Sequence, residues 1–398
     1  MPALQIYDAR ERMLVAAADR ALSLVSLVRS TWRRRVPPPS PRRILVLRLE
    51  RIGDLLMVLP ALADLRELAP KAEIDLVVGS WNVPLARTIP GITRVEALDA
   101  RWLTRGDAGS ALPSLLQRAR GWNDRQYDVG LNFEPDIRSN LILSAAGAAF
   151  TAGYHSGGGG PILDRAFTYE PRAHATDNAR RLVADVFGRG PQQPADAPLT
   201  LPESARRAAE VCIPSTAARP LVGVHVSGGR AIKQWPAMRF AEVARRLANA
   251  YGATIVLTGA SDDQPLVQQV RTSLEGSEVI DVSGDADLPT LAAILEQLDL
   301  FITGDTGPMH LAGAVGTPVV AVFGPSDPAR YALRGPSDRV VRVDLPCSPC
   351  NRIRVPPERC VGHTPDCLEL IPADRVVEAA IDVLTASRAS GLRRAERA

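Results

Sequence analysis

The stretch that decides the fold reads Ile44-Leu45-Val46-Leu47-Arg48-Leu49-Glu50-Arg51-Ile52-Gly53-Asp54. Its first four residues form a short apolar run, which is typical of a strand buried on both faces of a sheet. Gly53 permits a tight turn, and a helical pattern then continues to about Leu68 before Pro70 ends it. A buried strand that turns directly into a helix predicts a parallel sheet covered by helices.

The same alternation recurs along the chain. A Pro- and Ala-rich stretch at 190–220 separates two series, and we place the connection between two domains there. We predict an α/β protein of two Rossmann-like doubly wound parallel-sheet domains facing a cleft, with ligands outside the carboxyl ends of the strands. The predicted strands are 44–47, 74–78, 127–133, 221–226, 254–257, 300–303 and 319–323, and the second series has helices at 237–251, 265–274, 288–297 and 310–315.

The composition agrees with two globular domains. The chain has 398 residues, of which 46% are hydrophobic and 23% charged, and this length exceeds one ordinary core. A net charge of +3 is compatible with anionic ligands or a membrane surface but is too small to indicate nucleic acid. We recognise no apolar run of roughly 18 residues and no secretory signal, so we expect a cytoplasmic protein.

Residues 1–40 look separate from the rest. A stripe at 4-3-4-3-4 spacing predicts one apolar helix face, made of Leu14, Ala18, Ala21, Val25, Val28 and Trp32. Three arginines at 33–35 and a Pro-rich linker at 37–41 follow. Two interpretations stay open: a basic amphipathic anchor on an anionic membrane, and a helix docked on its own domain or on a partner. The expected segments are 1–40, 41–205, 206–385 and a tail at 386–398.

Asp54 follows the first strand at or near the start of a helix. The functional interpretation is a general base that accepts a proton from a hydroxyl. The simpler interpretation, which spacing alone favours, is a helix N-cap. A helix N-terminus also stabilises the carboxylate and would weaken it as a base, whereas burial in a closed cleft would act in the opposite direction.

Two loops of the second series suit a diphosphate. After the strand at 221–226, Ser227, Gly228 and Gly229 allow backbone N–H groups to approach an anion, and Lys233 adds a positive charge. After the strand at 300–303, Thr306 and Gly307 open a helix whose N-terminus favours a phosphate. The alternative for the first loop is a polar connection with solvated cations.

Three further side chains are weaker candidates. Asp305 suits a sugar hydroxyl or the orientation of Lys233, and His310 suits a ligand contact unless it is a histidine satisfied in the core. Asp262 lies just past the strand at 254–257, where acidic groups bind a ribose in dinucleotide folds, although a turn and helix cap explain it equally.

Four of the five cysteines crowd one segment, at Cys347, Cys350, Cys360 and Cys367. The first pair has the spacing of zinc ligands, but no second close pair follows. We therefore favour reduced structural thiols or an adventitious disulfide over a bound zinc ion, and we assign no metal site.

Taken together, these motifs resemble glycosyltransferase family 9, the ADP-heptose:lipopolysaccharide heptosyltransferases. The family pattern R-x-x-x-I-G-D-x-x-x-x-x-P matches residues 48–60, a loop ending K-x-W-P matches 233–236, and D-T-G-x-x-H matches 305–310. A later G-P-T/S-D-P turn matches 324–328, and the Cys-Pro-Cys segment with its later cysteines is also similar. The resemblance covers about residues 42–385 and implies a GT-B fold with an acceptor-side and a nucleotide-sugar-binding domain.

The resemblance also implies roles. It makes Asp54 the catalytic base, which reverses the preference for a simple cap, and it places Lys233 on the donor phosphates. It implies an inverting transfer of a sugar, heptose from ADP-heptose, to a lipopolysaccharide-type, lipid-linked glycan acceptor, with no required cofactor. Peripheral contact with the inner membrane is a separate expectation, which follows from the basic-anchor interpretation of residues 1–40. Arg51, Arg101 and Arg105 are candidates for acceptor binding, and solvated arginines are the alternative. Rival functions are a related transferase with another donor, a nucleotide-sugar epimerase and a non-catalytic scaffold.

Overall fold

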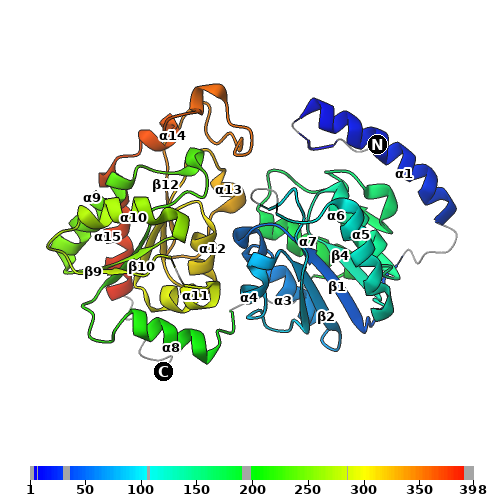
Figure 1. Cartoon of the computed structure of the whole chain (residues 1–398), viewed down its shortest axis with the longest axis horizontal. Helices are drawn as coiled ribbons and strands as arrows, with labels where there is room; N and C mark the ends of the chain where they lie inside the picture. Colours follow the sequence, from blue (N-terminus) through cyan, green and yellow to red (C-terminus); the bar gives the residue numbers. More distant parts are fainter. Residues whose placement is uncertain are drawn as a thin grey trace. The chain divides into compact units, whose positions relative to one another are not determined.

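The computed structural model describes residues 4–6, 8–29, 36–104, 108–190, 199–284 and 286–389. The chain divides into two compact units, Met1–Pro198 and Leu199–Ala398 (Figure 1). The division falls inside the Pro- and Ala-rich stretch 190–220. Each unit has a six-stranded sheet of its own in which every strand pairing is parallel, which confirms the predicted fold class.

The sheet of unit 1 has the order β3-β2-β1-β4-β5-β6. Arg48 at the end of β1 lies opposite Val78, the last residue of β2, and Leu47 lies opposite Asn132, the last residue of β4. The loops that leave these three strands therefore start at one edge of the sheet. The strands are β1 (Arg43–Arg48), β2 (Glu73–Val78), β3 (Arg94–Ala97), β4 (Val129–Asn132), β5 (Phe150–Tyr154) and β6 (Arg165–Phe167).

Helices cover both faces of this sheet (Figure 1). Leu45 and Leu47 of β1 pack against α5 (Leu112–Arg120) and α6 (Ile137–Ala145) in one apolar cluster. The other face lies under α3 (Leu59–Leu68) and α7 (Ala175–Phe187), which pack against each other. These layers bury both faces of the central strand, as its unbroken apolar run requires.

The single helix predicted from the first turn to Leu68 is two helices, α2 (Ile52–Leu56) and α3. Pro60 is the second residue of α3 and has no N–H with which to continue the α2 ladder. A proline in the first turn of a new helix leaves no bond unmade, so the chain restarts there. Short turns and helices complete unit 1: η1 (Ser80–Asn82), α4 (Val83–Ala86), η2 (Gly121–Arg125) and η3 (Gly160–Ile162).

The N-terminal segment forms α1 (Ala9–Arg29), which docks on the glycine-rich turn before η3. Among residues 9–24 of this helix, the buried side chains are Val15 and Asp19, which do not belong to the predicted stripe. Leu14 and Ala21 of that stripe are exposed. The side chains of Val25 and Val28, together with Trp32 and the three arginines at 33–35, lie outside the described residues. Of the stripe residues whose side chains the structure describes, Leu14 and Ala21 therefore do not dock on unit 1, and Ala18 is half-buried.

The sheet of unit 2 has the order β12-β11-β10-β7-β8-β9. Ile302 of β10 lies opposite Val224 of β7, and Gly304 lies opposite Val322 of β11. The loops after β7, β10 and β11 are therefore neighbours. The strands are β7 (Leu221–His225), β8 (Thr254–Thr258), β9 (Val279–Asp281), β10 (Leu300–Gly304), β11 (Val319–Val322) and β12 (Arg339–Val341).

One face of this sheet packs on α9 (Ala237–Tyr251), α10 (Gln264–Thr272) and α15 (Ala373–Ala389), and their shared core contains Val222 and Val224. The other face lies under α8 (Glu203–Cys212), α11 (Leu288–Gln297) and α12 (Gly307–Ala314) (Figure 1). The short helices are η4 (Ala231–Lys233), η5 (Ser261–Asp263), α13 (Pro328–Tyr331), η6 (Glu358–Cys360) and α14 (Asp366–Glu369). Within the described ranges, every helix is too short or too polar to cross a bilayer.

Candidate active site

Asp54 is the third residue of α2, directly beyond the carboxyl end of β1. Its Oδ2 accepts the backbone N–H of Arg51 at 3.3 Å, and its Oδ1 lies 3.2 Å from Nη2 of Arg48. The side chain is 30% exposed. The N-cap position belongs to Arg51 and not to Asp54, so the N-cap interpretation is wrong in position: Asp54 bonds back to the N-cap N–H from the third helical residue. Asp54 at the same time presents a reachable carboxylate that an arginine holds.

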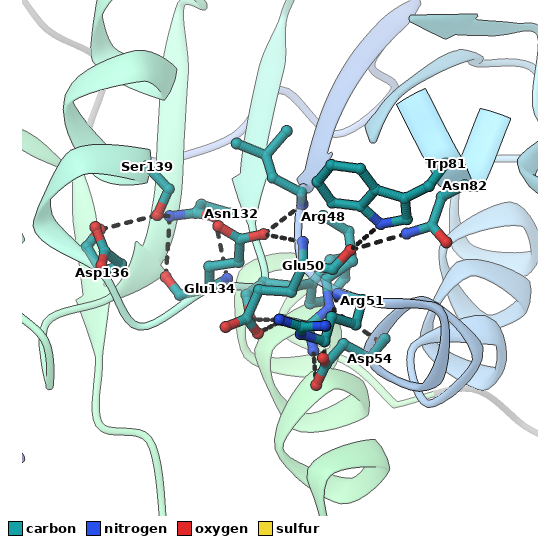
Figure 2. A network of polar contacts seen from close by, with 12 residues as sticks. Arg48, Glu50, Arg51, Asp54, Trp81, Asn82, Asn132, Glu134, Asp136 and Ser139 are labelled. Carbon is teal, nitrogen blue, oxygen red and sulfur yellow. Dashed lines mark hydrogen bonds and ion pairs between the residues drawn. The ribbon is translucent and has the colours of Figure 1, made fainter. Parts of the chain in front are cut away.

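Arg48 is buried at the end of β1 and ties three segments together (Figure 2). Its Nη1 donates to the carbonyl of Phe133 at 3.0 Å, its Nε donates to the carbonyl of Asp54 at 3.0 Å, and it pairs with Glu50 at 3.4 Å. Burial opposes its charge, but the carboxylates around it outweigh burial and raise the pKa of Arg48 above its usual value. The guanidinium is therefore a fixed positive charge that locates Asp54.

Glu134 is a further buried carboxyl at the same edge, two residues beyond β4. Its Oε1 accepts the N–H groups of Leu49 and, at 3.0 Å, Glu50, so it holds the turn that leaves β1. Burial, with the nearby charge of Glu50 as a second cause, raises the pKa of Glu134 to about 8. Figure 2 shows this carboxyl between β4 and the turn that carries Arg51 and Asp54.

Side chains from η1 and from the end of β4 hold this turn in place, the latter through Glu134. Trp81 Nε1 and Asn82 Nδ2 donate to the carbonyl of Glu50 at 3.2 and 2.8 Å (Figure 2). Asn132 accepts the N–H of Glu134 at 3.0 Å and donates to its carbonyl at 3.0 Å. The turn is thus fixed by bonds from residues 30 to 85 positions away, and no local sequence pattern announces them.

In unit 2, the loop after β7 is compact, and its glycines keep the backbone open to close approach. Ser227 is buried, and its Oγ accepts the N–H of Gly229 at 3.2 Å. A Cβ on Gly228 would lie 2.6 Å from the backbone nitrogen of Gln234, so only glycine lets the loop meet its own following turn. Gly229 has a φ of 66°, a left-handed conformation that glycine adopts without strain.

Lys233 ends η4 and meets Asp305, which follows β10. Lys233 Nζ and Asp305 Oδ2 are 2.8 Å apart, with side chains 19% and 11% exposed. Burial would raise the pKa of Asp305, but Lys233, a hydrogen bond from Ser326 and the charge of His310 together lower it below its usual range. The structure brings together the two residues that the sequence analysis paired.

The turn at residues 304–307 opens α12. Thr306 is the N-cap: its Oγ1 accepts the N–H of Met309 at 3.4 Å and lies 3.0 Å from Oγ1 of Thr303. Gly307 is the first residue of the helix, and His310 is buried one turn later. These residues place a helix N-terminus beside the Lys233–Asp305 pair, an arrangement that favours a phosphate group.

Other predicted residues lie elsewhere or do different work. Asp262 is exposed in η5, and its neighbour Asp263 caps that turn by accepting the N–H of Ala260 at 2.9 Å. Arg51 and Arg101 are exposed in unit 1, and Arg105 lies outside the described residues. Burial lowers the pKa of His225, a residue that the sequence analysis did not single out, to about 4, so it is neutral at the end of β7.

The cysteine segment packs beneath the turn at 324–327. The N–H groups of Cys350 and Asn351 donate to the carbonyl of Pro325 at 3.1 and 2.8 Å, and Ser348 Oγ donates to the carbonyl of Gly324 at 2.7 Å. All five cysteines are free thiols, and burial raises the pKa of Cys367 to about 11. In the described part of the chain, no three His, Cys, Asp or Glu side chains gather as a metal site. The segment therefore supports a loop of unit 2.

Comparison with known proteins fits this geometry. The sequence profile of glycosyltransferase family 9 (heptosyltransferase) matches residues 116–359, which is more than half of the chain. The chain belongs to glycosyltransferase family 9. It is a transferase of the heptosyltransferase type, and the resemblance drawn from its motifs is confirmed.

Individual relatives agree with this family. The chain is 24% identical over 309 residues to the lipopolysaccharide core heptosyltransferase OpsX of Haemophilus influenzae, which covers 76% of this chain and 85% of that protein. It is similar to the crystal structure of a family 9 glycosyltransferase from Veillonella parvula, with 25% identity, a TM-score of 0.75 and coverage of 87% and 98%. Escherichia coli heptosyltransferase WaaC with ADP-2-deoxy-2-fluoro heptose shares the fold, with 21% identity, a TM-score of 0.60 and coverage of 76% and 93%.

Proposed function

We propose that this family 9 enzyme transfers a heptose from ADP-heptose, with inversion, to a hydroxyl of a lipopolysaccharide-core acceptor. The observation that carries the proposal is the pair of prepared sites: a reachable carboxylate held by a buried arginine in unit 1, and an anion site beside a helix N-terminus in unit 2. A relative that acts on the lipopolysaccharide core and a fold relative that binds an ADP-heptose analogue support the choice of donor and acceptor class.

In this mechanism the Asp54 carboxylate takes the proton of the acceptor hydroxyl. The oxygen attacks the anomeric carbon from the side opposite the leaving group, the C–O bond to the diphosphate breaks, and ADP leaves with the bonding electron pair. The N–H groups around Gly228 and Gly229, the ammonium of Lys233 and the N-terminus of α12 stabilise the charge that develops on the diphosphate. Asp305 holds Lys233 in position.

Arg48 and Glu134 act on Asp54 as positioning residues. Arg48 binds both the carbonyl and the carboxylate of Asp54, and Glu134 fixes the turn that precedes it. The acceptor side also includes Arg51, Arg101 and Arg105, whose charges suit acidic or phosphorylated sugars.

The test is turnover of purified protein with ADP-heptose, measured as ADP release with and without a lipopolysaccharide-core acceptor. Transfer requires both substrates, and a glycosylated acceptor of inverted anomeric configuration is expected. Release of free sugar without acceptor would assign a hydrolase or epimerase instead. Calorimetric binding of ADP, UDP, GDP and CDP identifies the base of the donor. Preference for UDP or GDP would contradict the heptosyl donor. Absence of binding to all four nucleotides would favour the non-catalytic scaffold.

A further inference from the structure

The N-terminal helix α1 has one docked face and one exposed face. One face docks on unit 1: Asp19 Oδ1 accepts the N–H of Gly159 at 2.6 Å, and Val15 is buried against Gly158. A Cβ on Gly158, whose φ is 90°, would lie 2.3 Å from Val15 Cγ1, so the glycine run serves as the seat of the helix.

The segment before α1 is tied to the same place. Gln5 donates its N–H to the carbonyl of Ser156 at 2.7 Å and its side-chain amide to the carbonyl of Tyr169 at 2.7 Å. Contacts at Gln5, Val15 and Asp19 fix the first half of the helix and the segment before it, and they set which side faces outward. The orientation of α1 on unit 1 is thereby determined by bonds on its inner face.

The outer face is apolar and exposed. Met13, Leu14 and Leu24 are 66%, 72% and 69% exposed, and Ala17 and Ala21 between them are also exposed. The spacing of these residues repeats every three or four positions, so they form one stripe opposite Val15 and Asp19. Large apolar side chains grouped in this way on a helix mark a surface that binds a partner.

The charge around the stripe identifies the partner. Arg10 and Arg20 flank it and are exposed. The first 43 residues contain nine arginines and three acidic residues, whereas the other 355 contain 38 basic and 41 acidic residues. The positive charge of the chain is therefore concentrated in the first 43 residues of the sequence. Such charge favours an anionic partner and disfavours a second copy of the same helix, which would carry the same sign.

We propose that the outer face of α1 lies flat on an anionic lipid bilayer, with Met13, Leu14 and Leu24 inserted among the acyl chains and the arginines at the lipid phosphates. A helix of 21 residues is about 30 Å long, long enough for all three apolar side chains to insert together. A short apolar stripe alone binds a bilayer weakly, and anionic lipid supplies the second attraction. Binding is therefore reversible and sensitive to salt. The proposal does not depend on the transfer reaction.

The experiment is cosedimentation of the full-length protein, without substrates, with vesicles of phosphatidylcholine alone or of an equal mixture of phosphatidylcholine and phosphatidylglycerol. Wild-type protein binds the mixed vesicles at least about tenfold more tightly, and about 0.5 M salt removes most of this binding. Leu14→Glu/Leu24→Glu lowers binding to the mixed vesicles by at least about tenfold. The matched control is Val211→Glu/Val361→Glu, two exposed residues of unit 2, which binds as wild type.

A second variant keeps the test independent of helix stability. Arg10→Gln/Arg20→Gln leaves the apolar stripe intact and weakens binding to the mixed vesicles while the helix content, measured by circular dichroism, stays the same. Equal binding of wild type and Leu14→Glu/Leu24→Glu would overturn the proposal, as would failure of wild type to bind anionic vesicles. A concentration-dependent dimer that the same Glu pair abolishes would also overturn it and assign the face to a second copy.

Discussion

Asp54 in unit 1 and Asp305 in unit 2 each lie beyond the carboxyl end of a central strand, the first strand of the sheet in unit 1 and the fourth in unit 2. Each follows a parallel strand at its carboxyl end, each lies at or near the start of a helix, and each pairs with a cation. Their surroundings differ. The Asp54 side chain is 30% exposed and its arginine is buried, whereas Asp305 is 11% exposed and its lysine reaches toward solvent at 19%.

The two ion pairs therefore expose opposite members to solvent. Arg48 donates to the carbonyls of Phe133 and Asp54 and pairs with Glu50, all within unit 1. The more exposed member of its pair with Asp54 is therefore the carboxylate. Lys233 has three N–H donors, and its pair with Asp305 uses one of them. The more exposed member of that pair is therefore the cation. The comparison supports a base in unit 1 and an anion site in unit 2.

The largest expected effect on stability comes from Lys233→Met. Asp305 would remain buried without its partner, so we expect the free energy of unfolding to fall by about 3 kcal/mol in urea denaturation and ADP affinity to fall at least about tenfold in calorimetry. The pair Lys233→Met/Asp305→Asn recovers most of the stability but not the affinity. ADP binding by this double variant at wild-type strength would break the comparison.

Glu134 gives the next effect, which depends on pH. Its pKa is about 8 in the folded protein and about 4.3 in an unfolded chain, so the folded state binds more protons between these values. The free energy of unfolding contributed by Glu134 is therefore fully present below about pH 4 and is lost as pH rises through about 8. Between pH 5.5 and pH 8 the free energy of unfolding, measured by urea denaturation, should fall less in Glu134→Gln than in wild type. An identical loss would remove Glu134 from this role.

Seven of the twelve strands in the described residues could be predicted from the sequence, because these buried parallel strands are continuous apolar runs. The predicted helices 237–251 and 288–297 match α9 and α11, and the predicted strand 74–78 differs from β2 by one residue. The short strands β3, β6, β9 and β12 escaped prediction since they have three or four residues and few buried positions, which leaves no apolar run. The buried strand β5 (Phe150–Tyr154) also escaped prediction, because Thr151, Ala152 and Gly153 interrupt the run of large apolar residues.

In the candidate site, too, some residues could be predicted from the sequence and others could not. Motifs local in sequence indicated Asp54, Lys233 and the turn at Thr306, and their functional roles stay predictions. Glu134, Asn132 and Trp81 gave no signal, because each acts through a bond to a residue more than 30 positions away or to its own strand end. The helix α1 was predicted, but its docked face was not, since Asp19 is polar and its partner is the backbone N–H of Gly159.

A smaller effect sharpens the role of Arg48. Arg48→Lys keeps a positive charge but cannot bind the carbonyl and the carboxylate of Asp54 together with the carbonyl of Phe133. We expect kcat to fall by about tenfold with ADP affinity unchanged, and the kcat profile against pH to shift. Arg245→Lys, at an exposed position of α9, is the matched control. A change in ADP affinity as large as the change in kcat would speak against a positioning role confined to unit 1.

The smallest effect concerns the helix N-terminus in unit 2. Thr306→Ala removes the cap on the N–H of Met309, so the free energy of unfolding should fall by about 1 kcal/mol in urea denaturation. Thr306→Ser keeps the hydroxyl and should keep most of the stability. Equal losses in both variants would show that the methyl group, and not the cap, stabilises this turn.

The division of labour between the two carboxylates is tested most directly by comparing Asp54→Asn and Asp305→Asn in one assay of turnover and ADP binding. We predict that Asp54→Asn lowers kcat by about 100- to 10,000-fold and leaves the dissociation constant of ADP unchanged, because only the proton acceptor is lost. Asp305→Asn should weaken ADP binding, because Lys233 loses the group that orients it. Near wild-type turnover in Asp54→Asn, or a loss of ADP affinity in that variant equal to its loss of turnover, would contradict the account.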